Sequence, residues 1–382
     1  MKKTACYIHI PFCDHKCIYC DFYSIITSGN IKPFLKSLKK EINYYADKHS
    51  ERRELISIYF GGGTPSLMEA KYISEIIKTI KEKFNVQKNA EITLETNPGT
   101  VSLEKLKMFR DVGINRISIG IQSFDDKELK FLTRIHNSET AIRTVNDAAL
   151  AGFENISLDL IFNLPKQTKK RWIKNLAQTI KLPVKHISAY SLILERGTIL
   201  NKIVLDGKVK IRDEDYDAEL YETTINFLTS NGFYQYEVSN FTKPGYECVH
   251  NNAYWHYSDY FGFGTSAHSF INPANGTGGK RWWNYSSLKM YIENVKRFGS
   301  AVSGSEIISP EKALDEYVML ELRSSGLNIN RFEKLFGDSW LKEKYPYFEL
   351  LENQDFVKIH NGTIKLTAKG YAICDEILST IG

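Results

Sequence analysis

The sequence lacks the features of a membrane or secreted protein. No stretch of its 382 residues approaches the apolar length that a transmembrane helix needs. Its first residues, Met-Lys-Lys-Thr, lead into a short apolar strand rather than the longer apolar run of a signal peptide. We therefore expect a cytoplasmic protein, with any association at a membrane being peripheral and made through its partners.

The sequence also lacks a concentrated block of positive charge. The formal net charge is +5, and lysines in segments such as Lys32–Lys40 and Lys166–Lys174 are spread over helical patterns with acidic residues nearby. Solvated helix faces explain this distribution better than a nucleic-acid footprint does. We expect no nucleic-acid partner.

Cysteine is scarce and unevenly distributed. The chain has six cysteines, and three of them fall within residues 13–20. A disulfide framework would distribute its cysteines differently, whereas crowded cysteines in a cytoplasmic protein indicate a metal site in a reducing compartment.

The first part of the chain alternates short apolar strands with amphipathic helices. Alternation of this kind predicts a parallel sheet with right-handed crossovers. The predicted strands are Ala5–Ile10, Ile56–Phe60, Glu91–Glu95, Arg116–Ile121, Ile156–Ile161 and His186–Ser191. The predicted helices between and after them are Pro33–Asp47, Met68–Phe84, Leu103–Asp111, Glu139–Ala151, Lys169–Lys181 and Asp213–Ser230, with Ser102, Ser138 and Thr168 as expected N-caps. Six such units are too few to close an eight-stranded barrel, so we expect a partial (β/α)6 barrel of the α/β class.

The composition changes after this region, which suggests three parts. Residues 1–232 form the expected partial barrel, and residues 233–304 form an aromatic-rich connector. Residues 305–382 combine helices, at Pro310–Leu322, Asn330–Phe336 and Lys369–Leu378, with a hairpin at Asn361-Gly362. We expect this last part to be a small winged-helix-like domain.

The three crowded cysteines, Cys13, Cys17 and Cys20, have the spacing Cys-x3-Cys-x2-Cys directly after the first predicted strand. Three thiolates can bind three irons of a [4Fe–4S] cluster and leave the fourth iron without a protein ligand. A structural zinc site is the alternative, with His15 as a fourth ligand.

This triplet resembles the signature of the radical S-adenosylmethionine (radical SAM) superfamily, whose members use a partial (β/α)6 barrel. The resemblance implies a [4Fe–4S] cluster with an open iron that S-adenosylmethionine chelates through its amino and carboxylate groups. It also implies that one electron from the reduced cluster cleaves the sulfonium to methionine and a 5′-deoxyadenosyl radical.

Further residues near the ends of the predicted strands fit a ligand site. The glycines in Phe60–Pro65 permit close approach of the backbone to a ligand, and a tight turn into the next helix is an equally good interpretation from these residues alone. Glu95, Asp159 and Arg134 fit a zwitterionic ligand with ribose hydroxyls, because carboxylates bind ammonium and hydroxyl groups and Arg binds carboxylate. The alternative is an ion pair of Arg134 with Asp159 or Glu95 that only closes the barrel floor.

The pattern over nearly the whole chain resembles the branch that contains oxygen-independent coproporphyrinogen III oxidase. The resembling segments include Tyr7–Cys13, Phe60–Pro65, Glu95–Pro98, Gly120–Phe124 and Leu158–Ile161. The residues implied to contact S-adenosylmethionine are Tyr7, Gly62, Gly63, Thr64, Glu95, Gln122, Arg134 and Asp159, with Tyr19 against the adenine.

Two departures from the oxidase favour the HemW-type haem chaperones of the same branch. The oxidase motif continues as Cys-x-Cys after the third cluster cysteine, whereas here Cys20 and Asp21 are followed by Phe22. The oxidase also has an N-terminal extension, whereas here Tyr7 is almost at the start.

The segment His250-Asn251-Asn252-Ala253-Tyr254-Trp255 matches the His-Asn-x-x-Tyr-Trp motif of that chaperone group. His250 would ligate haem iron, with Tyr254 and Trp255 against the porphyrin. Cys248 is a second candidate ligand, and His268 is a candidate for lining the same region. From the residues alone, a hydrogen-bonded core histidine is the better interpretation of His250.

Together these patterns suggest a protein that binds haem and delivers it to acceptors such as respiratory enzymes. The cluster and S-adenosylmethionine would then serve assembly, oligomerisation or transfer. A one-electron donor such as flavodoxin or ferredoxin and a homodimer are further expectations. The alternatives are radical decarboxylation of coproporphyrinogen III propionates and radical methyl transfer, and the resemblance leaves open whether the protein is an enzyme.

Overall fold

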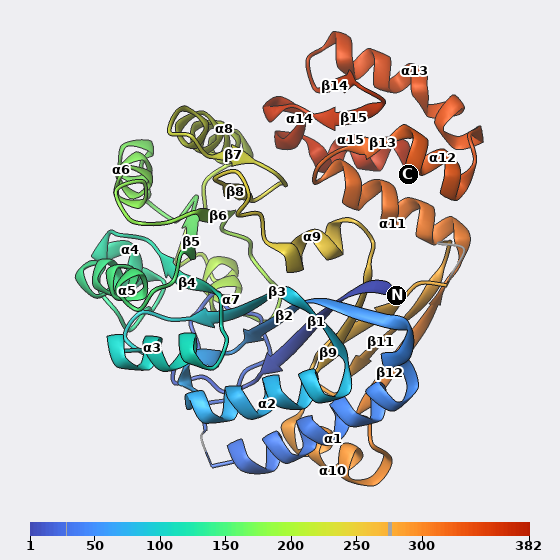
Figure 1. Ribbon diagram of the computed structural model, residues 1–382. Helices are drawn as coiled ribbons and strands as arrows, with labels where there is room; N and C mark the ends of the chain where they lie inside the picture. Colours follow the sequence, from blue (N-terminus) through green and yellow to red (C-terminus); the bar gives the residue numbers. More distant parts are fainter. Residues whose placement is uncertain (28, 274–276) are drawn as a thin grey trace.

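Six parallel strands lie side by side in chain order and form the centre of the molecule (Figure 1). The computed structural model describes residues 1–27, 29–273 and 277–382. The six strands are β1 (Lys2–Ile10), β2 (Arg53–Gly62), β3 (Asn85–Thr96), β4 (Arg116–Gln122), β5 (Asn155–Phe162) and β6 (His186–Ser191). Each contains the strand predicted from the sequence, and β6 has the predicted bounds.

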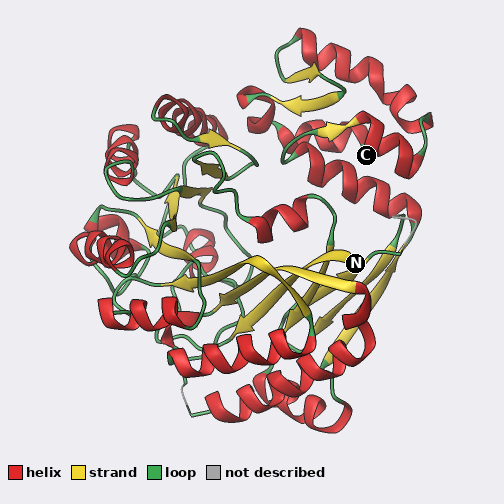
Figure 2. Ribbon diagram, in the orientation of Figure 1, coloured by secondary structure: helices red, strands yellow, loops and turns green. Residues whose placement is uncertain are grey.

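Helices between the strands cover the outer face of this sheet (Figure 2). The covering helices are α1 (Ile31–His49), α2 (Ala70–Lys83), α3 (Leu103–Asp111), α5 (Ser138–Leu150), α6 (Lys169–Thr179) and α8 (Glu214–Ser230). Ser102 and Thr168 cap α3 and α6 as expected, each accepting a backbone N–H. The expected cap Ser138 is wrong: the Asn137 side chain accepts from the Thr140 N–H, and Ser138 is already helical.

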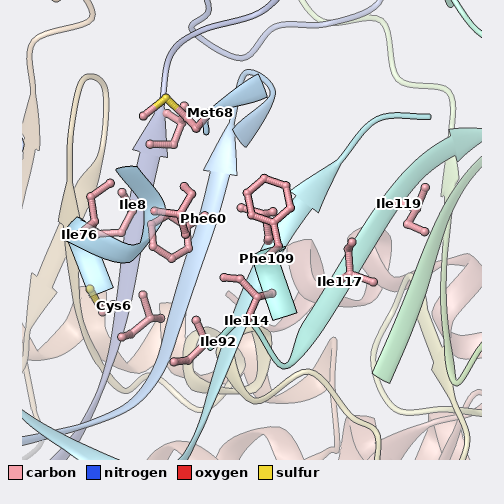
Figure 3. Packing of buried hydrophobic residues seen from close by; sticks show 14 of the residues in the cluster. Cys6, Ile8, Phe60, Met68, Ile76, Ile92, Phe109, Ile114, Ile117 and Ile119 are labelled. Atoms are coloured by element: carbon pink, nitrogen blue, oxygen red, sulfur yellow. The ribbon is translucent and has the colours of Figure 1, made fainter. Parts of the chain in front are cut away.

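The core lies between the strands and these helices (Figure 3). Alternate residues of each strand, such as Ile8, Phe60 and Ile117, are fully buried against helix residues such as Ile76 and Phe109. Burying a side chain of this kind contributes roughly 1.5–3 kcal/mol. Because strand side chains alternate, the residues between them point to the concave face.

The concave face is largely polar. β1 and β2 present Tyr7 and Tyr59 there, β3 presents Glu95, β4 presents Ser118, and β5 presents Asp159. The parallel register sets these strands beside one another, so the polar residues form one surface. This surface is where the candidate site lies.

Residues 233–304 contribute strands to the same sheet rather than only linking two parts. β9 (Asp259–Phe263) pairs in parallel with β1, and β10 (His268–Ile271), β11 (Gly279–Asn284) and β12 (Val302–Ile308) follow antiparallel. At the other edge, β8 (Asn240–Thr242) pairs with β6, and β7 (Tyr234–Gln235) follows it. The sheet is open because β12 and β7 are its edge strands in the order given by the described residues, as expected for a partial barrel.

Shorter helices complete this part of the chain. They are α4 (Asp126–Phe131), α7 (Ile199–Leu205), α9 (Val249–Trp255) and α10 (Leu288–Phe298). α9 lies against β1, β2 and β9, and α10 packs beside α1.

The last residues form the winged-helix-like unit expected from the sequence. Its order is α11 (Pro310–Leu322), β13 (Leu327–Asn328), α12 (Ile329–Phe336), α13 (Ser339–Asn353), β14 (Val357–His360) and β15 (Thr363–Leu366). Asn361 and Gly362 have φ angles of 49° and 71°, as a tight hairpin turn requires. The predicted closing helix is divided at Ile373 into α14 (Ala368–Ala372) and α15 (Cys374–Ile381).

Among the helices of residues 1–27, 29–273 and 277–382, none is both long enough and apolar enough to cross a bilayer.

Candidate functional site

The cysteine loop leaves β1 and is closed at its base. The Cys13 N–H donates to the Ile25 carbonyl at 3.0 Å, and the Ile25 N–H donates to the Pro11 carbonyl at 2.8 Å. Further along, the Ile18 N–H donates to the Thr133 hydroxyl at 3.2 Å. The loop is therefore fixed to the sheet while its three cysteines remain partly exposed, and none of them forms a disulfide.

The glycine segment after β2 packs directly under this loop. The Gly63 N–H donates to the Ile10 carbonyl and the Thr64 N–H to the Phe12 carbonyl, each at 2.8 Å. A Cβ on Gly63 would lie 2.6 Å from the Phe12 carbonyl oxygen. Glycine is therefore required at this position by close backbone approach, beyond the needs of a tight turn. The Thr64 hydroxyl also lies 3.3 Å from the Cys13 sulfur.

Two carboxyl groups lie beneath the glycines. Glu95 accepts hydrogen bonds from the Tyr59 hydroxyl at 2.9 Å and from the Gly62 N–H at 3.3 Å. Burial, and secondly the nearby Asp159, raise the pKa of Glu95 to about 7. Burial also raises the pKa of Asp159, which accepts from the Ser118 hydroxyl at 3.2 Å. Both groups gain from a positively charged ligand.

Arg134 reaches the same surface from the segment after α4. Its guanidinium donates to the Asn97 side-chain oxygen at 2.7 Å, to the Gly120 carbonyl at 2.6 Å and to the Cys17 sulfur at 3.6 Å. Burial is the largest influence on the Arg134 pKa, but nearby groups, Tyr19 and Cys17 first, raise it overall. Within the described chain Arg134 forms no ion pair with Glu95 or Asp159, so the alternative of a barrel-floor ion pair does not describe this site.

These groups line one cavity of about 370 Å³. The predicted residues on its wall are Cys13, Cys17, Tyr19, Cys20, Gly62, Gly63, Thr64, Glu95, Gln122, Arg134 and Asp159. Tyr7 is not on the wall: its ring packs on Tyr59, with 6.2 Å between ring centroids, and it lies behind Gly61. Phe22 is 62% exposed and lines the mouth.

The structure adds Asn97 to the site. Its amide donates to the Thr64 hydroxyl at 3.0 Å, and its carbonyl oxygen accepts from Arg134. Asn97 thus connects the glycine segment to the guanidinium. Its place at the end of β3, two residues after Glu95, is the signal by which sequence reasoning could have found it.

The donor set fits the groups that the sequence pattern implies. The loop carries three thiols and packs closely against Gly63, where a side chain would not fit. This arrangement suits a cluster in which each thiolate binds a different iron. Within the described ranges, no three His, Cys, Asp or Glu side chains lie close enough together to bind a single metal ion. A cluster does not need such a group, because each thiolate binds its own iron. Buried carboxyl groups and a guanidinium on the same wall suit a ligand that is both cationic and anionic.

His250 lies elsewhere, beneath the polar surface. Its side chain is buried, with the two ring nitrogens 2.9 Å from the Ser57 hydroxyl and 3.0 Å from the Tyr254 hydroxyl. Its ring stacks on Tyr59 at 4.8 Å between centroids. Burial, and secondly the charge of Arg116, lower the pKa of His250 to about 3, so the ring is neutral. In this structure His250 is a hydrogen-bonded core residue.

Glu91 holds the start of α9 in this buried region. Its carboxylate accepts from the Val249 N–H at 3.1 Å and the His250 N–H at 3.2 Å, where helix N–H groups lack partners. Cys248 is fully buried beside it, and burial raises the pKa of its thiol to about 12. Arg116, 2% exposed, lies 3.8 Å from the Glu91 carboxylate.

Family models match two parts of the chain. The model of the radical SAM superfamily matches residues 7–178, and the HemN C-terminal domain matches residues 308–373. A radical SAM domain implies a [4Fe–4S] cluster and S-adenosylmethionine, and the cysteine loop and cavity lie within the first match.

Individual relatives extend the similarity to the whole chain. The protein is 34% identical to "Heme chaperone HemW" of Bacillus subtilis over 98% of both chains. It is 41% identical to the protein of that name in Haemophilus influenzae over 72% of both. The chain belongs to the HemW family. A mitochondrial "Radical S-adenosyl methionine domain-containing protein 1" of Danio rerio is 32% identical over 99% of this chain and 87% of its own.

A solved structure supports the fold of this HemW-family chain. Coproporphyrinogen III oxidase (HemN) from Escherichia coli matches all of this chain and 90% of its own, with a TM-score of 0.83 and 25% identity. The similarity therefore includes the strands β7 to β12, here called the added strands, and the C-terminal unit as well as the radical SAM core.

Proposed function

We propose that this protein binds a [4Fe–4S] cluster and S-adenosylmethionine in the cavity beside the cysteine loop, called the first cavity below. We also propose that it binds haem and delivers it to haem-requiring acceptor proteins. The observation that carries this proposal is the similarity, over nearly the full chain, to proteins named heme chaperone. The intact cavity with its three cysteines supports the cofactor part.

The residues of the cavity divide the recognition of S-adenosylmethionine between them. Cys13, Cys17 and Cys20 hold three irons and leave the fourth open to the amino acid part of the ligand. Glu95 would accept a hydrogen bond from the amino group, and Arg134 would donate to the carboxylate. Bound there, the cluster supplies the electron that cleaves the sulfonium.

The other assigned contacts lie around this centre. Asp159 would bind the ribose hydroxyls, Tyr19 would contact the adenine, and Thr64 and Gln122 would make polar contacts; all four line the cavity. Tyr7 acts from behind, by packing on Tyr59, whose hydroxyl donates to Glu95.

A basic groove next to the cysteine loop suits an acidic electron donor such as flavodoxin or ferredoxin. This groove, of about 950 Å³, is lined by Lys127, Lys166, Arg171, Lys208, Lys210 and Arg212, which outnumber its two acidic residues, Glu128 and Asp213. Phe131 and Leu164 in its wall belong to the same apolar cluster as Tyr19. Reversing the charge of Lys166 and Lys210 should slow cleavage driven by a protein donor and leave cleavage driven by dithionite unchanged; slowing of both would contradict this role.

The test of the function compares two substrates. The anaerobically reconstituted protein is given dithionite and S-adenosylmethionine with either haem or coproporphyrinogen III. We expect stoichiometric haem binding, followed by the Soret absorption, and no protoporphyrinogen. Turnover of coproporphyrinogen would contradict the chaperone function and indicate the oxidase activity instead. The fold is similar to the structure of that oxidase. The acceptors, a homodimer and peripheral association at a membrane are expectations from the sequence.

A further inference from the structure

A second cavity, of about 480 Å³, lies between the added strands and the C-terminal unit. Tyr254 of α9 lines one side, and Met319 and Leu320 of α11 line another. α9 and α11 contact each other at this end of the molecule (Figure 1). The volume is in the usual range for small-molecule sites, about 300–1,000 Å³.

The floor of this second cavity is one face of the strands β9, β10 and β11. The antiparallel register places Phe270 opposite Tyr260 and His268 opposite Trp283. Because strand side chains alternate, the neighbouring Phe261 points the other way into the main core. Tyr260 and Trp283 are partly exposed on this floor, whereas Phe270 is 1% exposed and the Arg281 guanidinium lies 5.6 Å from its ring centroid. The two partly exposed rings suit contact with a flat apolar ligand.

His268 is the metal-binding side chain on this floor. Its ring stacks on Trp283, with 5.8 Å between centroids and 26° between planes, and the residue is exposed. Among the described residues, its ring forms no hydrogen bond.

His250 differs from His268 in each of these respects. Both of its ring nitrogens are engaged, and its side chain is 2% exposed. Its bond to the Tyr254 hydroxyl nevertheless connects it to the cavity, because Tyr254 stands on the wall and packs edge-on against Tyr260 at 4.6 Å. His250 can thus set the position of Tyr254 without reaching the ligand.

We infer that this second cavity is the haem site, that the His268 imidazole would bind the iron, and that His250 is a positioning residue acting through Tyr254. This inference rests on the proposed function, which supplies haem as the cargo. The partly exposed rings of Tyr260 and Trp283 would contact the porphyrin, and His268, the histidine among the described lining residues, would supply the imidazole for its iron.

The charges in the cavity indicate how the haem lies. Arg281 is already paired with Glu306 at 2.8 Å and with Glu316 at 2.6 Å. The propionates therefore gain little from Arg281 and extend into solvent at the side where His268 is exposed. A site that holds its ligand by one metal bond and apolar contacts, at an open edge, suits a cargo that must be released.

The test uses reconstituted full-length protein titrated with haem, with three variants. His268→Ala should weaken haem binding roughly tenfold or more and remove the histidine-ligand signature from the absorption and electron paramagnetic resonance spectra. Added imidazole should restore that signature. His250→Ala should weaken binding less and keep the signature, and His360→Ala, at an exposed histidine on β14, should change neither.

A ligand exchange makes the test independent of folding effects. His268→Cys should retain haem but shift its spectrum to that of a thiolate ligand, while the iron–sulfur absorption stays unchanged. Loss of the histidine signature in His250→Ala, with an unchanged spectrum in both His268 variants, would overturn the inference and leave the chaperone function standing. Failure of the wild-type protein to bind haem would instead contradict the proposed function.

Discussion

Among single residues, Glu95 shows how burial prepares the first cavity for its ligand. The side chain is held by Tyr59 and the Gly62 backbone, yet its pKa is raised to about 7 by burial and by Asp159. The cavity wall by itself therefore favours the protonated form more than water does. The positive charge of bound S-adenosylmethionine and a hydrogen bond from its amino group would reverse this by stabilising the carboxylate.

Replacing Glu95 by Gln should weaken S-adenosylmethionine binding by about 1.5–3 kcal/mol, the contribution of a hydrogen bond to a charged group. Because the carboxylate forms as pH rises through the pKa of about 7, wild-type affinity should increase from about pH 6 to about pH 8. The variant should lose most of this pH dependence. Calorimetric titration of reconstituted protein measures both, and an equal pH dependence in wild type and variant would contradict the role of Glu95.

Gly63→Ala should displace the cysteine loop, because the new Cβ would lie 2.6 Å from the Phe12 carbonyl oxygen. We expect a loss of about 1–3 kcal/mol in the free energy of unfolding, as for other overpacked sites, and a reduced iron content. Gly29→Ala is the matched control, since its Cβ would lie 3.9 Å from the nearest atom. Full iron content and wild-type stability in Gly63→Ala would refute the tight fit.

The wall of the first cavity could largely be predicted from residues, because motif residues at the ends of parallel strands must meet at one edge. Asn97 was missed as a site residue although it follows Glu95 by two positions. The environment of His250 could not be deduced from its motif. Its neighbours Ser57 and Glu91 lie on strands that are far from it in the sequence. Only the fold reveals that both ring nitrogens lie within hydrogen-bonding distance of hydroxyl groups.

Among the elements, α9 connects the buried Glu91 of β3 to the second cavity. Its first N–H groups end on Glu91, which also faces the buried Arg116, and its Tyr254 reaches the second cavity. The position of this short helix therefore depends on a buried charge on β3.

Glu91→Ala should destabilise the protein by about 3–5 kcal/mol, because it leaves Arg116 as an unpaired buried charge and the start of α9 without its acceptor. Urea unfolding measures the change. Glu54→Ala, at a partly exposed position on β2, is the control and should cost less than about 1 kcal/mol. A loss of similar size in both variants would show that Glu91 does not hold α9.

The strands and helices with clear periodicity were predicted well, as β6, α3 and α11 show. The strands β9 to β12 were missed because the sequence there lacks a clear alternation of apolar and polar residues. Aromatic residues occur on both faces of the sheet: Phe261 and Trp282 enter the core, while Tyr260 and Trp283 line the second cavity. The break at Ile373 was also missed, since nothing in the local pattern interrupts the apolar period there.

At the scale of the whole molecule, the two cavities are separate and share no lining residue. Cys17→Ser should therefore abolish the iron–sulfur absorption and change haem affinity by less than about threefold, a difference below 1 kcal/mol. Iron analysis and haem titration of the same sample provide the comparison. Parallel loss of the cluster and of haem binding would indicate one shared site.

The measurement that tests the account most directly is haem transfer from the loaded protein to a haem-free acceptor enzyme, followed by the activity that the acceptor gains. We predict stoichiometric loading of the protein and a gain of acceptor activity matching the haem lost. A loaded protein that retains its haem while the acceptor stays inactive would contradict the account.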